Sequence, residues 1–191
     1  MNKDIQTICP TGRQDWRNWL QVNHKTEQSV WVIYYKMKAG IQTMTWSEAV
    51  DEALCFGWID SVRKTVDDEK FIQFFCKRKP TSGWSKINKA NVQRLINDGM
   101  MTPAGHESIE RAKQNGSWKI LDEVEELVIP KDLEKAFKTH KGSKAFFVGL
   151  SKSVKKMMLQ WIVLAKRPET RKKRIDEIVE LAAQKLKPKQ F

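Results

Sequence analysis

The sequence has little cysteine and no paired cysteines. Cys9, Cys55 and Cys76 are the three it contains, and no two of them form a CxxC pair. An odd number of widely spaced cysteines argues against a disulfide framework and against a structural zinc site. The three histidines are equally scattered. The sequence therefore predicts no metal site, and we expect no cofactor.

Long hydrophobic runs are also missing. The longest apolar run, from Val30 to Tyr35, is far too short to cross a bilayer. The N-terminus reads MNKDIQTICPTGRQDW, without the apolar stretch and the small-residue cleavage pattern of a secretory signal. We therefore expect no transmembrane segment and a cytoplasmic location.

The common catalytic fingerprints are absent as well. The sequence contains no HExxH, GxSxG, GxxxxGK[ST] or GxGxxG pattern. These patterns are typical of metalloproteases, serine hydrolases and nucleotide-binding proteins. Their absence leaves open whether the protein is an enzyme, and it specifies no reaction.

What the sequence has in excess is positive charge, most of it near the C-terminus. The formal net charge is +12. Residues 141–191 contain fourteen Lys or Arg and four Asp or Glu, a net charge of +10, whereas the preceding residues contain twenty-one and nineteen. Such an asymmetry indicates two functional regions, and the basic one suits an anionic partner.

Hydrophobic periodicity and helix-capping residues predict an α+β protein. The expected order is a helix at 12–24, strands at 29–37 and 41–44, a helix at 45–56, strands at 58–66 and 71–77, helices at 85–98 and 102–115, an acidic connection at 118–130, and helices starting at residues 143, 151 and 168. This order predicts a small, mostly antiparallel sheet packed with helices, followed by a C-terminal helical module. We place the two domains at residues 1–128 and 129–191.

The strands at 58–66 and 71–77 are expected to form a hairpin. A short polar turn gives partner numbers that sum to 137, with Asp60 opposite Lys77 and Arg63 opposite Phe74. On that register Trp58 and Asp60 share one face of the sheet, and Arg63 lies on the other.

The first candidate site combines this hairpin with the start of the next helix. Its members are aromatic, cationic or hydroxyl residues with one acid: Trp58, Asp60, Arg63, Arg78, Trp84, Ser85 and Lys86. Indole faces can form an apolar wall, Arg and Lys can hold an anionic group, and Asp60 can orient a hydroxyl or take a proton. In the alternative interpretation Asp60 pairs with Lys77 across the strands, and both tryptophans belong to the core.

Two cysteines lie near this site, and we interpret both as structural. Cys55 is close to a helix C-terminus, the wrong end of the helix dipole for a thiolate. Cys76 is next to Lys77 and Arg78, which could lower its pKa, but strand alternation predicts that it is buried.

The second candidate is a basic segment at the junction of the last two helices. Its residues are Lys166, Arg167, Arg171, Lys172, Lys173 and Arg174. Such a segment can neutralise phosphates of nucleic acid or of lipid. The alternative is a solvated helix face without a partner.

Three stretches together resemble a known family. They are EAVDEALCFGWIDS, WSKINKANVQRLINDGMMTPAG and AKRPETRKKRI. In content and order they are similar to the YdeI/OmpD-associated family, also called the bacteriocin-protection family, over about residues 16–187. The resemblance implies stress protection against cationic antimicrobial peptides or bacteriocins, in association with an outer-membrane porin. The family is described as periplasmic, and it supplies no catalytic residues to transfer.

Three functions follow as hypotheses. The leading one is a binding or stress-protection protein that engages an anionic ligand, nucleic acid or anionic surface through its basic module. The alternative is an enzyme that acts on a small anionic substrate, with Asp60 as acid or base and Arg63, Arg78 or Lys86 as the anion holder. The third is a homo-oligomer whose many tryptophans fill an interface.

Overall fold

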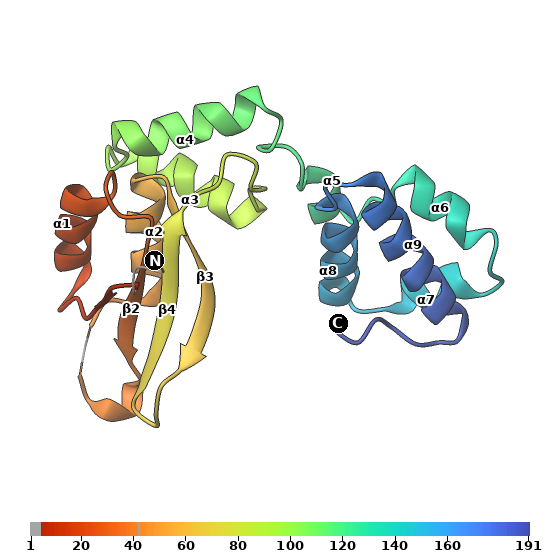
Figure 1. The fold of residues 1–191 in the computed structure, drawn as a ribbon, viewed down its shortest axis with the longest axis horizontal. Helices are drawn as coiled ribbons and strands as arrows, with labels where there is room; N and C mark the ends of the chain where they lie inside the picture. Colours follow the sequence, from red (N-terminus) through yellow and green to blue (C-terminus); the bar gives the residue numbers. More distant parts are fainter. Residues whose placement is uncertain (1–4, 42) are drawn as a thin grey trace. The chain divides into compact units, whose positions relative to one another are not determined.

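The computed structural model describes residues 5–41 and 43–191, which form two compact units (Figure 1). The first, which we call the sheet unit, consists of residues up to 82 together with 87–115. The second, the helical unit, consists of residues 83–86 and 116–191. The division of the chain into domains at residues 128 and 129 stays a prediction.

The sheet unit contains a four-stranded mixed sheet in the order β1-β2-β4-β3. The strands are β1 (Thr7–Ile8), β2 (Ser29–Tyr35), β3 (Trp58–Thr65) and β4 (Lys70–Lys77). The β1 strand runs parallel to β2, and the other two pairings are antiparallel. The predicted α+β class is thus confirmed, although the sheet is mixed rather than purely antiparallel.

The helices of this part of the chain are α1 (Arg13–Asn23), α2 (Trp46–Cys55), α3 (Lys86–Asn97) and α4 (Pro103–Gln114), with a short 3₁₀ turn, η1 (Met37–Ala39). Helices α1 and α2 pack on one face of the sheet. In Figure 1, α2 runs along the sheet. Trp16 of α1 packs against Phe75 of β4 with ring centroids 5.2 Å apart, and its indole N–H donates to the carbonyl of Ala49 in α2. This contact joins both helices to the inner face of the sheet.

Local helix signals were correct at some positions and wrong at others. Thr45 and Glu48 have the spacing of a capping box, and they form one at the start of α2. Thr11 and Gln14 have the spacing of a capping box, but Thr11 caps no helix, because Gly12 is the N-cap residue of α1 and the Thr11 amide donates to Asp15 Oδ2 at 2.9 Å. The short strand predicted at 41–44 includes residue 42, which lies outside the described residues, and the rest of that stretch forms no strand.

The predicted hairpin exists, but its register is wrong. Asp60 pairs with Phe75 rather than with Lys77, and Arg63 pairs with Gln73 rather than with Phe74. The pairing shifts between Asp60 and Arg63. This bulge inserts an extra residue into β3, so Arg63 lies on the same face as Asp60 instead of the opposite one.

The helical unit consists of five helices among the described residues. They are α5 (Asp122–Glu125), α6 (Lys131–Phe137), α7 (Ser143–Gly149), α8 (Lys152–Val163) and α9 (Pro168–Ala183). Buried apolar residues from all five pack into one core that includes Val124, Leu133, Phe147, Ile162 and Ile178. Met157 and Leu186 have the helical spacing of core residues, but they are 41% and 53% exposed.

Candidate functional site

Asp60 lies at the centre of a polar cluster on the inner face of the sheet unit. Its Oδ2 accepts a hydrogen bond from Trp46 Nε1 at 3.0 Å and a longer one from Gln73 Nε2 at 3.3 Å. Trp46 is the first residue of α2, so the capping box at Thr45 fixes the position of this donor. Burial raises the pKa of Asp60, while the Trp46 hydrogen bond and the charge of Arg78 oppose that rise.

Arg78 lies just beyond the end of β4 and is buried. Its backbone N–H donates to the carbonyl of Gly57 at 2.9 Å, which ties the end of β4 to the start of β3. Burial lowers the pKa of the guanidinium to about 10, although the negative charge of Asp60 acts against this. Asp60 and Arg78 thus affect each other electrostatically across the ends of two strands.

Arg63 belongs to a stack of flat groups on the same face. Its guanidinium carbon lies 3.7 Å from the centroid of the Phe71 ring, and that ring is stacked on Tyr34 at 4.9 Å with an interplanar angle of 4°. The Tyr34 hydroxyl is buried, and within the described part of the chain it has no hydrogen-bond partner. Burial raises the pKa of this hydroxyl, and the nearby charge of Asp60 adds to the rise.

Both tryptophans of the predicted site are buried. Trp58 is 1% exposed, and its ring packs edge-on to Trp19 at 5.8 Å. Trp84 is also 1% exposed, and its ring lies 5.0 Å from Trp118. Neither indole presents a free face to solvent, which agrees with the alternative interpretation of core residues for these two positions.

The seven predicted residues are divided between the two units. Trp58, Asp60, Arg63 and Arg78 belong to the sheet unit, whereas Trp84, Ser85 and Lys86 belong to the helical unit. Within the helical unit, the Lys86 backbone N–H donates to Glu125 Oε1 at 3.1 Å, and its ammonium lies 3.5 Å from Glu126 Oε1. The proposed role of these seven residues in ligand binding stays a prediction.

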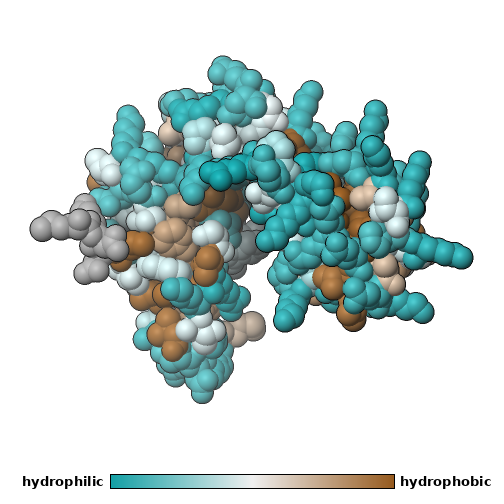
Figure 2. Space-filling model, turned by 45° about the vertical axis from the view of Figure 1, so that its right-hand side comes forward, coloured by the Kyte–Doolittle hydropathy of each residue, from teal (hydrophilic) through white to brown (hydrophobic). Residues whose placement is uncertain are grey.

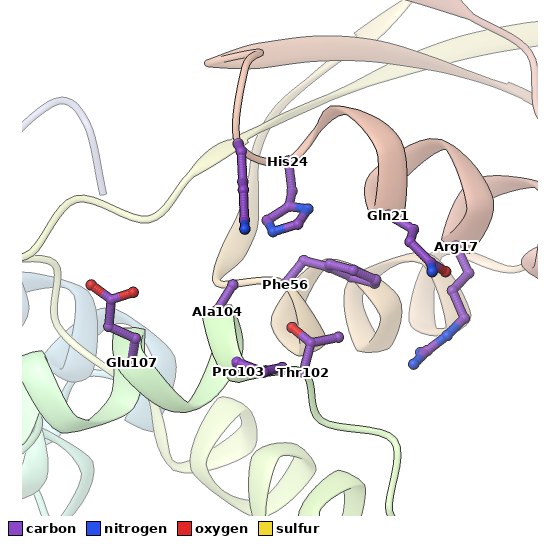
Figure 3. Close-up of a pocket in the computed structure, with 9 residues that line it drawn as sticks. Arg17, Gln21, His24, Phe56, Thr102, Pro103, Ala104 and Glu107 are labelled. Atoms are coloured by element: carbon purple, nitrogen blue, oxygen red, sulfur yellow. The ribbon is translucent and has the colours of Figure 1, made fainter.

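A pocket of about 440 Å³ lies in the sheet unit, away from the predicted cluster. It is lined by Arg17, Gln21, His24, Lys25, Phe56, Thr102, Pro103, Ala104 and Glu107. Figure 3 shows the Phe56 ring at its centre, between His24 and Thr102, with Arg17 and Glu107 at opposite ends. Arg17 and Gln21 of α1 and its C-cap residue His24 recur at helical spacing, and this signal in the sequence could have indicated the pocket.

The polar groups of the pocket are held by bonds to buried partners. Arg17 donates to Glu52 Oε2 at 2.6 Å and to the carbonyl of Met100 at 2.9 Å, and Glu52 is 1% exposed. Because His24 Nδ1 faces the carbonyl of Leu20 at 2.9 Å, Nδ1 carries the hydrogen. In the neutral imidazole, Nε2 is then an acceptor. The pocket therefore combines an aromatic floor with both hydrogen-bond donors and acceptors, the acceptors including the Glu107 carboxylate.

The two cysteines near the predicted site have raised pKa values. Burial raises the pKa of the Cys55 thiol to about 11, and the charge of Glu52 adds to this. Burial is also the main cause of the raised pKa of Cys76, which Lys79 and Arg78 oppose. Both thiols remain protonated at neutral pH, so they are poor nucleophiles.

The basic segment at the start of α9 divides into paired and unpaired cations. Arg171 forms two hydrogen bonds with Asp132 at 2.6 and 3.0 Å, and Lys172 pairs with Asp176 at 2.7 Å. Arg174 lies over the Trp161 ring and donates to the Trp161 carbonyl. Within the described part of the chain, the exposed Lys166, Arg167 and Lys173 have no ion-pair partner.

Residues 5–41 and 43–191 contain no group of three or more His, Cys, Asp or Glu arranged to hold a metal ion. None of the helices in these ranges has the length and apolar character needed to span a membrane.

The fold defines a two-unit α+β protein with a basic helical C-terminal unit, and family models match both parts. Residues 8–108 match the model described as a domain of unknown function (DUF8412). This match covers more than half of the chain, so the chain belongs to that family. Residues 126–185 match the model described as bacteriocin-protection, YdeI or OmpD-associated. No curated protein and no solved structure matches the chain.

The resemblance to the YdeI/OmpD-associated family is thus confirmed for the C-terminal part. Only the stretch AKRPETRKKRI lies within residues 126–185. The other two stretches, at residues 48–61 and 84–105, lie within the residues that match the domain of unknown function. The similarity to this family is therefore shorter than the sequence indicated.

Proposed function

We propose that the protein is a binding protein in bacteriocin or antimicrobial-peptide protection that engages an anionic partner through its helical unit. The match of residues 126–185 gives the link to bacteriocin protection at the level of the family. The observation that carries the finer proposal is the set of exposed, unpaired cations Lys166, Arg167 and Lys173, in a region with a net charge of +10. On the face shown in Figure 2, the helical unit is mainly hydrophilic, with small hydrophobic patches.

The charge of the chain favours an anionic partner over a cationic peptide. A protein with a net charge of +12 repels cationic peptides at long range. The acidic stretch around α5 is a candidate for attracting a cationic peptide, but two of its carboxylates are already paired with lysines. Glu125 pairs with Lys156 at 2.6 Å, and Glu126 lies near Lys86. Protection through an anionic surface or polymer therefore fits the charges better than direct capture of the peptide.

Charge reversal at the three unpaired cations tests this proposal. We expect the triple variant Lys166→Glu, Arg167→Glu, Lys173→Glu to bind immobilised heparin about tenfold more weakly than wild type at low salt, and wild-type binding to weaken steeply with salt. A matched variant reverses three other exposed lysines of the same unit, Lys119, Lys131 and Lys138. An equal loss of heparin affinity in both variants would show that only the overall charge matters. Weak binding by wild type that does not depend on salt would contradict the proposal.

A second candidate function is binding or turnover of a small anionic molecule by the sheet unit. The pocket of about 440 Å³ favours it, because Lys25 and the start of α4 supply positive potential beside the aromatic ring of Phe56, whereas the charge of Arg17 is balanced by Glu52. A thermal-shift screen with nucleotides, sugar phosphates and organic acids tests this function. Stabilisation by a compound should disappear in Lys25→Ala if the pocket holds it, and in Asp60→Asn if the predicted cluster does. The absence of any stabilising compound would count against both sites.

A further inference from the structure

The outer face of the sheet, opposite the helices, carries aromatic side chains that are only half-buried. The strand register places Trp31 and Tyr35 of β2 and Phe74 of β4 on this face. Their neighbours on the inner face, Val30 and Phe75, are 0% exposed. The aromatic residues of the outer face are therefore not needed to complete the core.

These aromatic rings form two platforms along the sheet. Trp31 and Phe74 are direct cross-strand partners, with ring centroids 4.9 Å apart and an interplanar angle of 63°. Tyr35 follows Trp31 by four residues, so its platform lies about 13 Å further along β2 at roughly 3.3 Å per residue. The apolar residues Ile33 and Ile72 pair between the two platforms.

The charged groups among these rings are both positive. The ammonium of Lys64 lies 4.8 Å from the centroid of the Trp31 ring, and that of Lys70 lies 5.2 Å from the centroid of the Tyr35 ring. At the paired strand positions that face outward in the described structure, there is no Asp or Glu. This face thus presents flat π surfaces together with cations, which is complementary to a polyanion with planar bases.

We propose that this face binds single-stranded RNA, with bases stacked on the two aromatic platforms and phosphates on Lys64 and Lys70. Aromatic side chains on an open sheet, combined with basic residues, are the usual means of binding unpaired nucleotides. A base that stacks on Trp31 displaces the ammonium of Lys64 from the ring, and the long side chain then reaches a neighbouring phosphate.

The choice of RNA over DNA rests on hydroxyl groups beside the first platform. Thr7 of β1 is the strand partner of Trp31, and Ser29 lies two residues before Trp31 on the same face. Both hydroxyls can bond with a ribose 2′-hydroxyl, the group that distinguishes RNA from DNA. This inference goes beyond the proposed function, because it concerns the sheet unit and an aromatic face rather than the basic helices.

The test measures fluorescence anisotropy of a labelled oligouridine of about twelve nucleotides, with two comparison probes. One is an abasic strand of the same length and charge, and the other is oligodeoxyuridine. We expect wild type to bind oligouridine about tenfold more tightly than the abasic strand, and more tightly than oligodeoxyuridine. Trp31→Ala should reduce oligouridine binding about tenfold, and Trp31→Phe should retain most of it. Val22→Ala, which removes a 76% exposed apolar side chain from α1, should change nothing.

Several results would overturn the proposal. These are equal binding of oligouridine and the abasic strand, equal or tighter binding of oligodeoxyuridine, and unchanged binding by a folded Trp31→Ala variant. If light scattering shows a dimer that Trp31→Phe dissociates, a second copy covers the face and the proposal also fails.

A charge variant keeps the test decisive if Trp31→Ala does not fold. Lys64→Ala combined with Lys70→Ala should lower the slope of log affinity against log salt by about 1.4 for oligouridine. An unchanged slope would contradict the phosphate contacts. Heparin has no bases, so Trp31→Phe and Trp31→Ala should leave heparin binding unchanged. Charge reversal in the helical unit should leave the ratio of oligouridine to abasic binding unchanged, so the two proposals fail independently.

Discussion

Asp60 shows how burial and hydrogen bonding compete at a single residue. Its carboxylate accepts hydrogen bonds from Trp46 and Gln73, which favour the charged form, but burial raises its pKa more strongly. The folded protein therefore binds a proton at Asp60 more tightly than the unfolded chain does. The sequence indicated that Asp60 is a polar residue of a candidate site, but no local spacing links it to Trp46, its hydrogen-bond donor fourteen residues earlier.

The raised pKa of Asp60 predicts a specific pH dependence of stability. Its contribution is fully present below the ordinary pKa of an aspartate, and it is lost as pH rises through the raised value. Asp60→Asn cannot titrate, yet its side-chain oxygen can still accept the Trp46 hydrogen bond. The free energy of unfolding of the variant minus that of wild type should therefore increase as pH rises through this window, as measured by urea denaturation.

Other acids act in the opposite direction but cancel in this comparison. Glu48 and Asp132 have lowered pKa values because of hydrogen bonds from Thr45 and Arg171 respectively, so their contributions are lost as pH falls. They are present in both proteins. A difference that stays flat with pH would contradict the raised pKa of Asp60.

Two elements meet at closer than usual distance where α4 starts beside the end of α2. The Thr102 hydroxyl donates to the carbonyl of Cys55 at 2.7 Å, and the Thr102 amide donates to the same oxygen at 3.2 Å. A Cβ atom at Gly105 would lie 2.4 Å from that oxygen and 2.6 Å from Met101 Cε. Only glycine lets the two helices approach this closely, and the same approach positions Thr102 in the pocket.

Gly105→Ala should therefore destabilise the sheet unit although alanine is the better helix former. We expect a loss of about 1 to 3 kcal/mol in the free energy of unfolding, the usual range for overpacking. Gly149→Ala in α7 is the matched control, because a Cβ there meets nothing within 4 Å. It should change stability by no more than about 1 kcal/mol. Denaturant titrations of both variants measure the difference in the free energy of unfolding. An equal loss in both would show that the structure tolerates a Cβ at Gly105 and would contradict the prediction.

The hairpin shows what element prediction from sequence achieves. Strand identity in β3 and β4 was predictable, because both segments are rich in β-branched and aromatic residues between turn signals. The register was not predictable, because a bulge between Asp60 and Arg63 changes which residues share a face. Consequently Arg63 stacks on Phe71, on the same face of the sheet as Asp60. Regular alternation along β3 would have placed Arg63 on the opposite face.

At the scale of the whole molecule, the chain divides into two units with separate cores. Residues 83–86 belong to the helical unit although the residues on either side of them belong to the sheet unit. Trp84 is the buried residue of this short stretch, and it packs on Trp118. A Cβ at Gly83 would lie 2.9 Å from Leu121 Cδ1, so this stretch packs tightly in the helical unit.

Trp84→Ala should therefore weaken the helical unit selectively. Removal of a buried tryptophan side chain costs about 3 to 5 kcal/mol. Hydrogen exchange should become faster in peptides from residues 116–191 and stay unchanged in peptides from α1, α2 and β4.

Trp16→Ala is the matched variant for the other unit, since Trp16 is 0% exposed and packs on Phe75. In this variant, hydrogen exchange should become faster in peptides from α1, α2 and β4 and stay unchanged in peptides from residues 116–191. Uniform acceleration across both units in either variant would show that the two cores unfold together rather than separately.

The sequence by itself determined the α+β class, most helices and strands, the concentration of positive charge near the C-terminus and the family resemblance of residues 126–185. These features depend on local periodicity, capping and composition, which neighbouring residues specify. Only the tertiary structure decided the register of β3, the burial of Trp58 and Trp84, the pairing of Arg171 with Asp132, and the aromatic face around Trp31. Each of these depends on residues distant in sequence, whose proximity is set by strand pairing and core packing and not by local spacing.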